Sequence, residues 1–309
     1  MSSHGLFDRL IERCTAMAPQ RIAVAFPTTA VALGAVHELA RKKWLEAVLV
    51  GPRAVIMALA KTHSLDIDRF EIVEARDERE AAAKAVALCK NDRADFLMKG
   101  SLHTDVLMRA VLARDTGLRG TRRVSHAFVL DAPAYPRPLI ITDAAINIRP
   151  TLDEKVDIAR NAIDLAHALG IDKPNLAVLS AVETVNANLT STIDAAALSK
   201  MAERNQIVGA TIDGPLAFDT AVSAEAARLK DLTSSVAGRA DIVLVPDLES
   251  GNMLAKQLEY LGDAELAGVV LGARIPIVLT SRADAARARL ASCAIAMLYA
   301  NHMRSLIPV

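Results

Sequence analysis

The sequence has few aromatic residues, few cysteines and no net charge. Aromatic residues make up 3% of the 309 positions, whereas hydrophobic residues make up 52%, so the core must consist mainly of aliphatic side chains. The 36 basic residues equal the 36 acidic residues in number, and this balance removes the general attraction that nucleic acid or an anionic membrane would exploit. Any anion-binding site must therefore be built locally.

The few cysteines and the lack of a long apolar run argue against a disulfide-bonded, zinc-binding or membrane-spanning protein. Cys14, Cys89 and Cys293 are far apart and form no C-x-x-C pair, which argues against disulfides or zinc and predicts reduced thiols in the cytoplasm. Cys293 lies in an apolar helix-like segment, so we expect a buried, unreactive thiol. The uncharged stretch 290–301 is well short of the ~20 residues that span a bilayer, and residues 1–13 are typical of an amphipathic helix rather than a signal peptide.

Several nucleotide and hydrolase motifs are also absent. The chain has no G-x-G-x-x-G after a strand-like run, no G-x-x-x-x-G-K-[ST], no H-E-x-x-H and no G-x-S-x-G. These absences argue against dinucleotide-binding, P-loop, zinc-protease and serine-hydrolase functions.

Aliphatic strand-like runs alternate with helix-like segments, which predicts parallel sheets covered by helices. The expected strands are 21–25, 47–50, 70–74, 94–98, 139–142, 175–179, 207–212, 241–245 and 275–280. The expected helices are 28–43, 53–62, 78–90, 152–169, 194–204, 252–261 and 284–303. The length favours two domains, with a break in the proline-dense segment 132–138, and the last strand and helix fit either domain.

Polar clusters follow five of the strand-like runs, where ligands of open parallel sheets bind. The clusters are Lys99–Ser101, Asp143, Asp213–Pro215, Pro246–Asn252 and Ser281–Arg282. We therefore expect a site at the carboxyl ends of the strands.

The stretch from Ser234 and Ser235 to Lys256 is the most specific pattern in the chain. Gly251 and Asn252 are placed to open a helix whose free N–H groups would suit phosphate, and Lys256 lies one turn further on. The alternative is that the Gly-Asn pair is only a turn and cap, with Lys256 a solvated charge.

The other strand ends carry the same two interpretations. The guanidinium of Arg282 suits phosphate, with Ser281 beside it, but a helix-capping serine and an exposed arginine would give the same pattern. Lys99 and His126 are polar candidates for anion binding or proton transfer. Asp143 and Asn147 can act together with the nearby Arg149, or Asp143 can simply cap a turn.

Taken in order, these residues resemble the phosphate acetyl/butyryl transferase family, and more closely its phosphate butyryltransferase branch. The resemblance covers almost the whole chain. The stretches that carry it are 97–100 with Thr104, 125–126, 142–150, 181–183, 213–222, 235–241, 246–252 and 276–284.

The resemblance implies a fold and an assembly. It implies a two-domain α/β fold with parallel-rich sheets flanked by helices, similar to isocitrate and isopropylmalate dehydrogenases, with the active site in the interdomain cleft. The last segment then returns to the first domain, giving 1–138 plus 270–309 as one domain and 139–269 as the other. The expected assembly is a homodimer or higher homo-oligomer.

The resemblance also implies reversible transfer of a short acyl group, acetyl to butyryl, between coenzyme A and inorganic phosphate. Both are substrates, and we expect no cofactor and no metal. Arg282 is expected to bind phosphate, with Ser281 donating a hydrogen bond to the reacting sulfur or carbonyl. The acetyltransferase branch carries an acid seven positions after the serine; because Ala288 stands there, Asp284 is the candidate base or orienting group.

Two rival functions are left open. A metal- and NAD(P)-dependent decarboxylating dehydrogenase of the same fold needs clustered carboxylates, but Asp213, Asp219 and Asp247 are scattered over separate segments. A non-catalytic coenzyme A or acyl phosphate sensor is the other alternative, and the retention of Ser281, Arg282 and Asn252 argues against it.

Overall fold

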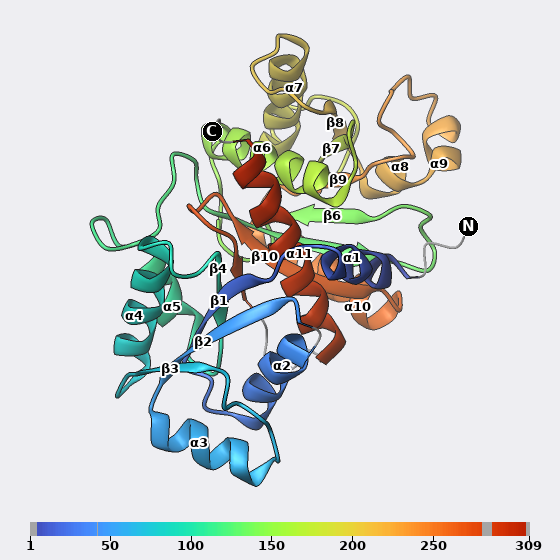
Figure 1. The fold of residues 1–309 in the computed structure, drawn as a ribbon. Helices are drawn as coiled ribbons and strands as arrows, with labels where there is room; N and C mark the ends of the chain where they lie inside the picture. Colours follow the sequence, from blue (N-terminus) through green and yellow to red (C-terminus); the bar gives the residue numbers. More distant parts are fainter. Residues whose placement is uncertain (1–4, 42, 280–285, 307–309) are drawn as a thin grey trace. The chain divides into compact units, whose positions relative to one another are not determined.

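The computed structural model describes residues 5–41, 43–279 and 286–306, and the chain divides into two compact units. Unit 1 comprises residues 1–6 and 123–266, and unit 2 comprises residues 7–122 and 267–309. Each unit is an α/β structure in which helices pack on a sheet that is mostly parallel (Figure 1).

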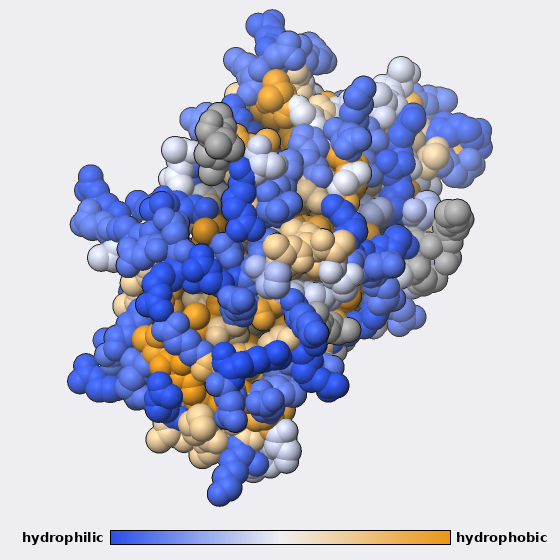
Figure 2. All heavy atoms as spheres, in the orientation of Figure 1, coloured by the Kyte–Doolittle hydropathy of each residue, from blue (hydrophilic) through white to orange (hydrophobic). Residues whose placement is uncertain are grey.

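Unit 2 has the strand order β3-β2-β1-β4-β11-β10. Its strands are β1 (Gln20–Ala25), β2 (Leu45–Gly51), β3 (Glu71–Glu74), β4 (Phe96–Lys99), β11 (Ile277–Val278) and β10 (Glu265–Leu271), which begins at the end of unit 1. Its helices are α1 (Leu6–Thr15), α2 (Ala30–Arg41), α3 (Arg53–Thr62), α4 (Glu78–Lys90), α5 (Thr104–Val111) and α11 (Ala286–Ser305). Strands β3, β2, β1, β4 and β11 are parallel, and β10 is antiparallel to β11. In Figure 2, an apolar patch lies over β2 and β3 with hydrophilic side chains around it.

Unit 1 has the strand order β5-β6-β9-β7-β8. Its strands are β5 (Ser125–Asp131), β6 (Leu139–Thr142), β7 (Asn175–Leu179), β8 (Thr211–Leu216) and β9 (Ile242–Leu244). Its helices are α6 (Leu152–Leu169), α7 (Thr190–Glu203), α8 (Phe218–Val222), α9 (Ala224–Leu229) and α10 (Leu248–Leu261). Strand β5 is antiparallel to β6, and the other pairs are parallel.

Local sequence accounts for several element boundaries. Helix α4 begins where the Asp77 carboxylate accepts hydrogen bonds from two backbone N–H groups of the first turn. Helix α6 begins at a reciprocal capping box between Thr151 and Glu154 and ends at Gly170, whose φ of 95° suits glycine. One face of the unit 1 sheet, including Ile141 and Val243, packs in an aliphatic cluster with Ala255 of α10. This core holds the carboxyl ends of β6 and β9 in register.

The structure corrects four expectations from the sequence. Helix α10 begins at Leu248 rather than at residue 252, and α7 begins at Thr190 rather than at 194. Strand β8 runs through residues 213–215, which therefore lie within a strand and not beyond its end. The proline-dense segment 132–138 joins the antiparallel strands β5 and β6 inside unit 1.

Candidate active site

Lys99 and the loop after it form the carboxyl end of β4 in unit 2. Lys99 pairs with Ala25 of β1 and is 5% exposed, and its ammonium group contacts the carbonyl oxygens of Gly100 and Leu102 at 3.4 and 3.3 Å. A Cβ on Gly100 would lie 2.5 Å from the carbonyl oxygen of Ala25, so only glycine fits there. The expected strand end is confirmed, and Lys99 is held inward against its own loop.

Asp143 organises the loop after β6 in unit 1. Its Oδ1 accepts hydrogen bonds from the N–H groups of Ala145 and Ile146 at 2.9 and 3.0 Å. Its Oδ2 accepts from the backbone and the side-chain nitrogen of Asn147 at 3.2 and 2.5 Å. Burial raises the pKa of Asp143, and these hydrogen bonds oppose the rise. The carboxylate therefore shapes the loop, as the turn interpretation anticipated.

Asn147 connects this loop to the start of β5. Its Nδ2 donates to the carbonyl oxygen of Val124 at 2.9 Å as well as to Asp143, and its Oδ1 accepts from Nε of Arg123 at 2.7 Å. Because β5 runs antiparallel to β6, the first residues of β5 lie beside the end of β6. Asp143 and Asn147 are thus brought together as expected.

His126 lies at the start of β5 and is completely buried. Burial lowers the pKa of His126 to about 4, so the imidazole is neutral at pH 7. Its ring meets that of Phe128 edge-on at 4.4 Å between centroids. Its Nδ1 has no hydrogen-bond partner among the residues that the structure describes. A neutral imidazole in this position can donate or accept one hydrogen bond but does not supply a positive charge.

Gly251 and Asn252 lie inside the first turns of α10 and do not open it. The Asp247 carboxylate accepts from the N–H group of Ser250 at 2.8 Å, and the N–H group of Gly251 donates to the carbonyl oxygen of Asp247 at 3.2 Å. The expectation of a helix start at Asn252 with free N–H groups is therefore wrong. A Cβ on Gly251 would lie 2.7 Å from Cγ2 of Val245 and 3.0 Å from the backbone oxygen of Asp143.

The remaining candidates of the 234–256 stretch have separate roles. Asn252 donates to the carbonyl oxygen of Ala144 at 3.2 Å and so ties α10 to the loop after β6. Lys256 is paired with Glu259 at 2.7 Å on the surface. Ser234 accepts from the N–H groups of Val236 and Ala237 at 3.0 Å. The adjacent Ser235 is exposed.

A cluster at the ends of β7 and β8 was not among the expected site residues. Lys230 contacts Glu183 at 2.9 Å and Asp219 at 3.0 Å, and Thr220 donates to Glu183 at 3.1 Å. Burial acts to raise the pKa of Glu183, but the hydrogen bonds from Lys230 and Thr220 lower it overall. Because β6, β9, β7 and β8 are parallel neighbours in that order, their carboxyl ends share one edge of the sheet. The only sequence signal was that Glu183 and Asp219 fall in the stretches that carry the family resemblance.

The three expected catalytic residues, Ser281, Arg282 and Asp284, lie outside the described residues. The prediction for Cys293 is confirmed, because it is 1% exposed and burial raises the pKa of its thiol to about 12. Within the described ranges, no three His, Cys, Asp or Glu side chains are grouped as a metal site would require. No helix there has the length and apolarity to cross a membrane.

The fold and the polar edge of unit 1 define an α/β protein with the architecture of the phosphotransacylases. A branched-chain phosphotransacylase from Enterococcus faecalis V583 matches the structure with a TM-score of 0.81 at 29% identity, over 92% of this chain and 99% of that one.

Sequence comparison then gives the family. Residues 78–297 match the family described as "Phosphate acetyl/butaryl transferase". The chain is 56% identical to the phosphate acetyltransferase of Rhizobium meliloti, over 97% of this chain and 95% of that protein. It is 40% identical to the phosphate butyryltransferase of Clostridium acetobutylicum, over 96% and 98% respectively. The chain belongs to the phosphate acetyl/butyryl transferase family, which confirms the family resemblance found in the sequence. Identity to the named acetyltransferase exceeds identity to the named butyryltransferase, whereas the sequence pattern had favoured the butyryltransferase branch.

Proposed function

We propose that this chain catalyses reversible transfer of a short acyl group between coenzyme A and inorganic phosphate. Membership of the family, at 56% identity over nearly the full length of a named phosphate acetyltransferase, is the observation that carries the proposal. The same relationship disfavours the decarboxylating dehydrogenase. Because identity to the butyryltransferase is lower, at 40%, acetyl is the preferred acyl group.

In the proposed reaction, a phosphate oxygen attacks the carbonyl carbon of the thioester. The carbon–sulfur bond then breaks, and the products are an acyl phosphate and the coenzyme A thiolate, which takes up a proton. Arg282 holds the phosphate, Ser281 donates a hydrogen bond to the sulfur or carbonyl oxygen, and Asp284 exchanges the thiol proton. Holding the two substrates in contact contributes up to ~7–11 kcal/mol in favourable model reactions.

The described residues support these groups in two ways. Asp143, Asn147 and Asn252 hold the loop after β6 rigid at the carboxyl edge of unit 1. His126 offers a neutral polar group for a ligand, while Lys99, Ser235 and Lys256 are weaker candidates. Ser234 stays a candidate for the phosphate surroundings, whereas the backbone N–H group of Gly251 is already bonded to the carbonyl oxygen of Asp247.

The remaining features of the proposal concern the assembly. The fold is similar to the isocitrate and isopropylmalate dehydrogenases, its two domains enclose the active site in a cleft, and two chains form a homodimer. The protein works in the cytoplasm without a metal or cofactor, and coenzyme A and phosphate are its substrates.

The test is phosphate-dependent release of free thiol from acetyl-, propionyl- and butyryl-coenzyme A, measured in parallel. We expect release with all three and the highest kcat/KM for acetyl. Binding of coenzyme A without thiol release would instead establish a non-catalytic sensor.

Substitution of Arg282 tests the phosphate assignment. Arg282→Ala should raise the apparent KM for phosphate strongly, because a bidentate partner is lost. Arg287→Ala is a matched control: this arginine pairs with Asp8 on the surface, and its loss should leave both KM values unchanged. An unchanged phosphate KM in Arg282→Ala would place the phosphate elsewhere.

In a separate experiment, Asp284→Asn should lower kcat at least ~10²-fold if Asp284 acts as the base.

A further inference from the structure

A pocket of about 510 Å³ lies at the amino ends of the strands of unit 2, at the opposite end from the loop that follows Lys99. This volume falls within the range of small-molecule sites, ~300–1,000 Å³. It is lined by the second residues of β1 and β2, Arg21 and Glu46, and by the first residue of β3, Glu71. Because β1 rises about 3.3 Å per residue, Arg21 lies roughly 13 Å from Ala25 at the carboxyl end. The pocket is therefore separate from the edge where acyl transfer is proposed.

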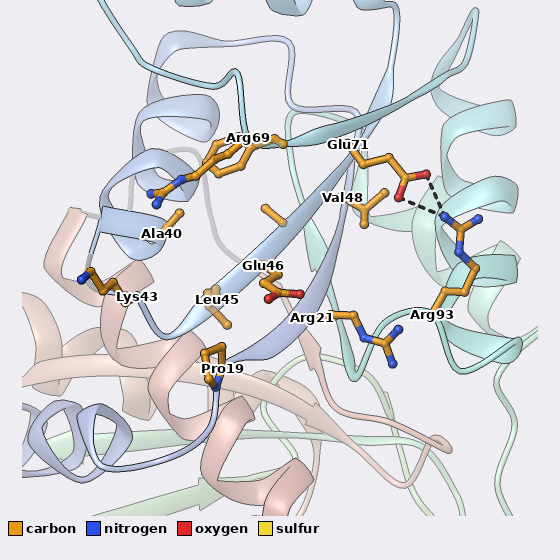
Figure 3. A pocket seen from close by; sticks show the side chains of 12 residues that line it. Pro19, Arg21, Ala40, Lys43, Leu45, Glu46, Val48, Arg69, Glu71 and Arg93 are labelled. Atoms are coloured by element: carbon orange, nitrogen blue, oxygen red, sulfur yellow. Dashed lines mark hydrogen bonds and ion pairs between the residues drawn. The ribbon is translucent and has the colours of Figure 1, made fainter.

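The walls of the pocket differ in charge. Figure 3 shows Arg69 and Lys43 on one side, the Glu71–Arg93 pair on the other, and Glu46 and Arg21 between them. Arg93 binds both carboxylate oxygens of Glu71, at 2.8 and 3.0 Å, so these two charges neutralise each other.

The charges on the other side are not neutralised in this way. The guanidinium of Arg69 stacks over the ring of Phe70 at 5.6 Å, which fixes its position and leaves its N–H donors available. Arg69 and Lys43 form no ion pair with a carboxylate in the described part of the chain. Arg21 donates to the carbonyl oxygen of Asp92 at 2.7 Å. The side of the pocket formed by Arg69 and Lys43 is thus a positive wall.

The floor of the pocket is apolar apart from Glu46, which lies between Leu45 and Ala47 in β2. Leu45, Ala47 and Val48 of β2 contribute to it, and the apolar patch of Figure 2 lies over the same strand. An apolar floor beside two uncompensated cations is complementary to a molecule that carries an anionic group on an apolar body. A fully hydrated small anion would leave the floor unused, and a neutral apolar molecule would leave the cations unused.

We propose that this pocket is a second ligand site, which binds an amphipathic anion with a carboxylate, sulfonate or phosphate group against Lys43 and Arg69. The apolar part of the ligand lies on β2. Glu46 stands in the pocket without a salt-bridge partner among the described residues, so it weakens the attraction for an anion. The site lies at the opposite ends of the strands from the proposed acyl-transfer edge, so its ligand is not one of the reactants.

The probe for the test is 1-anilinonaphthalene-8-sulfonate, an aromatic sulfonate that fluoresces when bound to an apolar site. We expect saturable binding of one probe per chain, weakened by salt. The double variant Lys43→Gln with Arg69→Gln should weaken binding about tenfold, because two attractive charges are lost. Glu46→Gln should tighten it about twofold to threefold with the stoichiometry still one probe per chain and the thermal unfolding midpoint unchanged, which distinguishes the effect from the extra, non-stoichiometric probe binding that misfolding produces.

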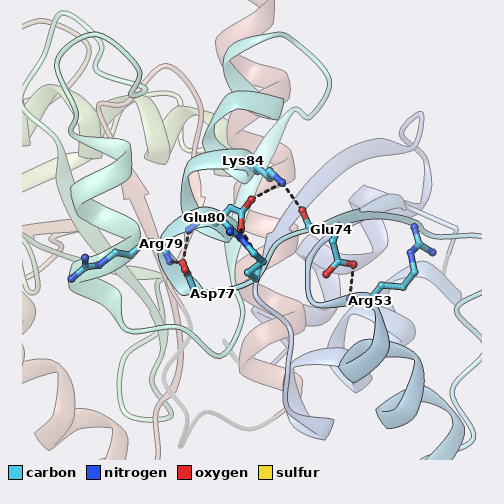
Figure 4. Close-up of polar contacts among 7 residues, drawn as sticks. Arg53, Glu74, Asp77, Arg79, Glu80 and Lys84 are labelled. Carbon is cyan, nitrogen blue, oxygen red and sulfur yellow. Dashed lines mark hydrogen bonds and ion pairs between the residues drawn. The ribbon is translucent and has the colours of Figure 1, made fainter.

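The control is the double variant Lys61→Gln with Arg79→Gln. Both residues are exposed, belong to unit 2 and lie outside the pocket lining, and Figure 4 shows Arg79 pointing away from its neighbours. The control should bind the probe like the unmodified chain. Equal probe affinity in the two double variants would overturn the proposal.

Competition identifies the class of ligand. Octanoate and 1-naphthyl phosphate should both displace the probe, and the stronger competitor shows whether the anion is a carboxylate or a phosphate. Failure of both to displace it would overturn the assignment to amphipathic anions. Displacement by coenzyme A at concentrations that saturate turnover would show that the pocket holds a substrate, and would overturn the assignment of a second site.

Discussion

The loop after β6 and the start of β5 lie at the same edge of unit 1 and each carries a buried titratable side chain, but the two side chains differ in their hydrogen bonding. Asp143 accepts four hydrogen bonds from within its own loop, whereas Nδ1 of His126 has none among the described residues. A buried polar group is costly when it is unpartnered, so such a group is often retained for a ligand. Asp143 therefore stabilises the loop of the candidate site, whereas His126 retains a ring nitrogen that can bind a ligand.

The largest expected effect is on Asp143. Asp143→Ala leaves three backbone N–H groups without acceptors and removes one of the two acceptors of the Asn147 side-chain amide, which should lower the free energy of unfolding by about 3 kcal/mol or more. Asp143→Asn keeps one acceptor oxygen and should lower it less. Chemical denaturation of both variants is the measurement, and a loss below about 1 kcal/mol for the alanine variant would contradict the assigned role.

The next effect is the pH dependence contributed by His126. Its pKa is lowered from 6.5 to about 4 in the folded chain, so the unfolded chain binds the proton first as the pH falls. The stability from the neutral ring is complete above pH 6.5 and is lost as the pH falls toward 4, by about 3 kcal/mol in total. The raised pKa of Asp143 acts with the opposite sign, so the unmodified chain alone does not isolate the histidine.

Comparison with His126→Phe isolates it. The phenyl ring has no proton to bind, so the difference in unfolding free energy between the two proteins should shift by about 2 kcal/mol between pH 7.5 and pH 4.5. At pH 7.5, kcat/KM should fall in the variant while stability changes little, because no hydrogen bond to Nδ1 is removed. A parallel pH dependence in both proteins would contradict the buried neutral ring.

The sequence predicted elements best where the signals were local. The bounds of α3, α4, α6, β6 and β7 were predicted as they are observed, and both α4 and α6 begin at a capping side chain. Helix α10 was predicted too short because Asp247 caps it, while Gly251, taken for a helix-opening turn, is a packing residue inside it. The pairing of β5 with β6 is antiparallel, which alternating elements did not indicate.

In the candidate site, too, features set by local sequence were predictable and features set by distant residues were not. The gathering of polar residues at strand ends was predictable, because parallel strands bring their carboxyl ends to one edge. The turn role of Asp143 was one of two open interpretations. The burial of His126 and the Glu183–Lys230–Asp219 contacts depend on residues far apart in the chain, so no local pattern contained them.

A smaller effect tests how closely α10 approaches the loop after β6. Gly251→Ala places a methyl group 3.0 Å from the backbone oxygen of Asp143 and should lower the free energy of unfolding by about 1–3 kcal/mol. Gly34→Ala is the matched control, because nothing lies within 4 Å of its Cβ position in α2. That variant should be stabilised by about 0.5–1 kcal/mol. Thermal and chemical unfolding of the pair is the measurement, and equal signs would contradict the close approach.

The smallest expected effects compare two side chains of α10, Asn252, which contacts the loop after β6, and Lys256, which lies on the surface. Asn252→Ala removes one half-buried hydrogen bond to Ala144 and should lower the free energy of unfolding by about 1 kcal/mol. Lys256→Ala removes a surface ion pair with Glu259 and should change it by less than about 0.5 kcal/mol. If Lys256 nevertheless binds substrate, its variant will raise the KM for coenzyme A or phosphate at unchanged stability. Unchanged KM values would show that Lys256 is a solvated charge, while Asn252 carries the connection from α10 to the site.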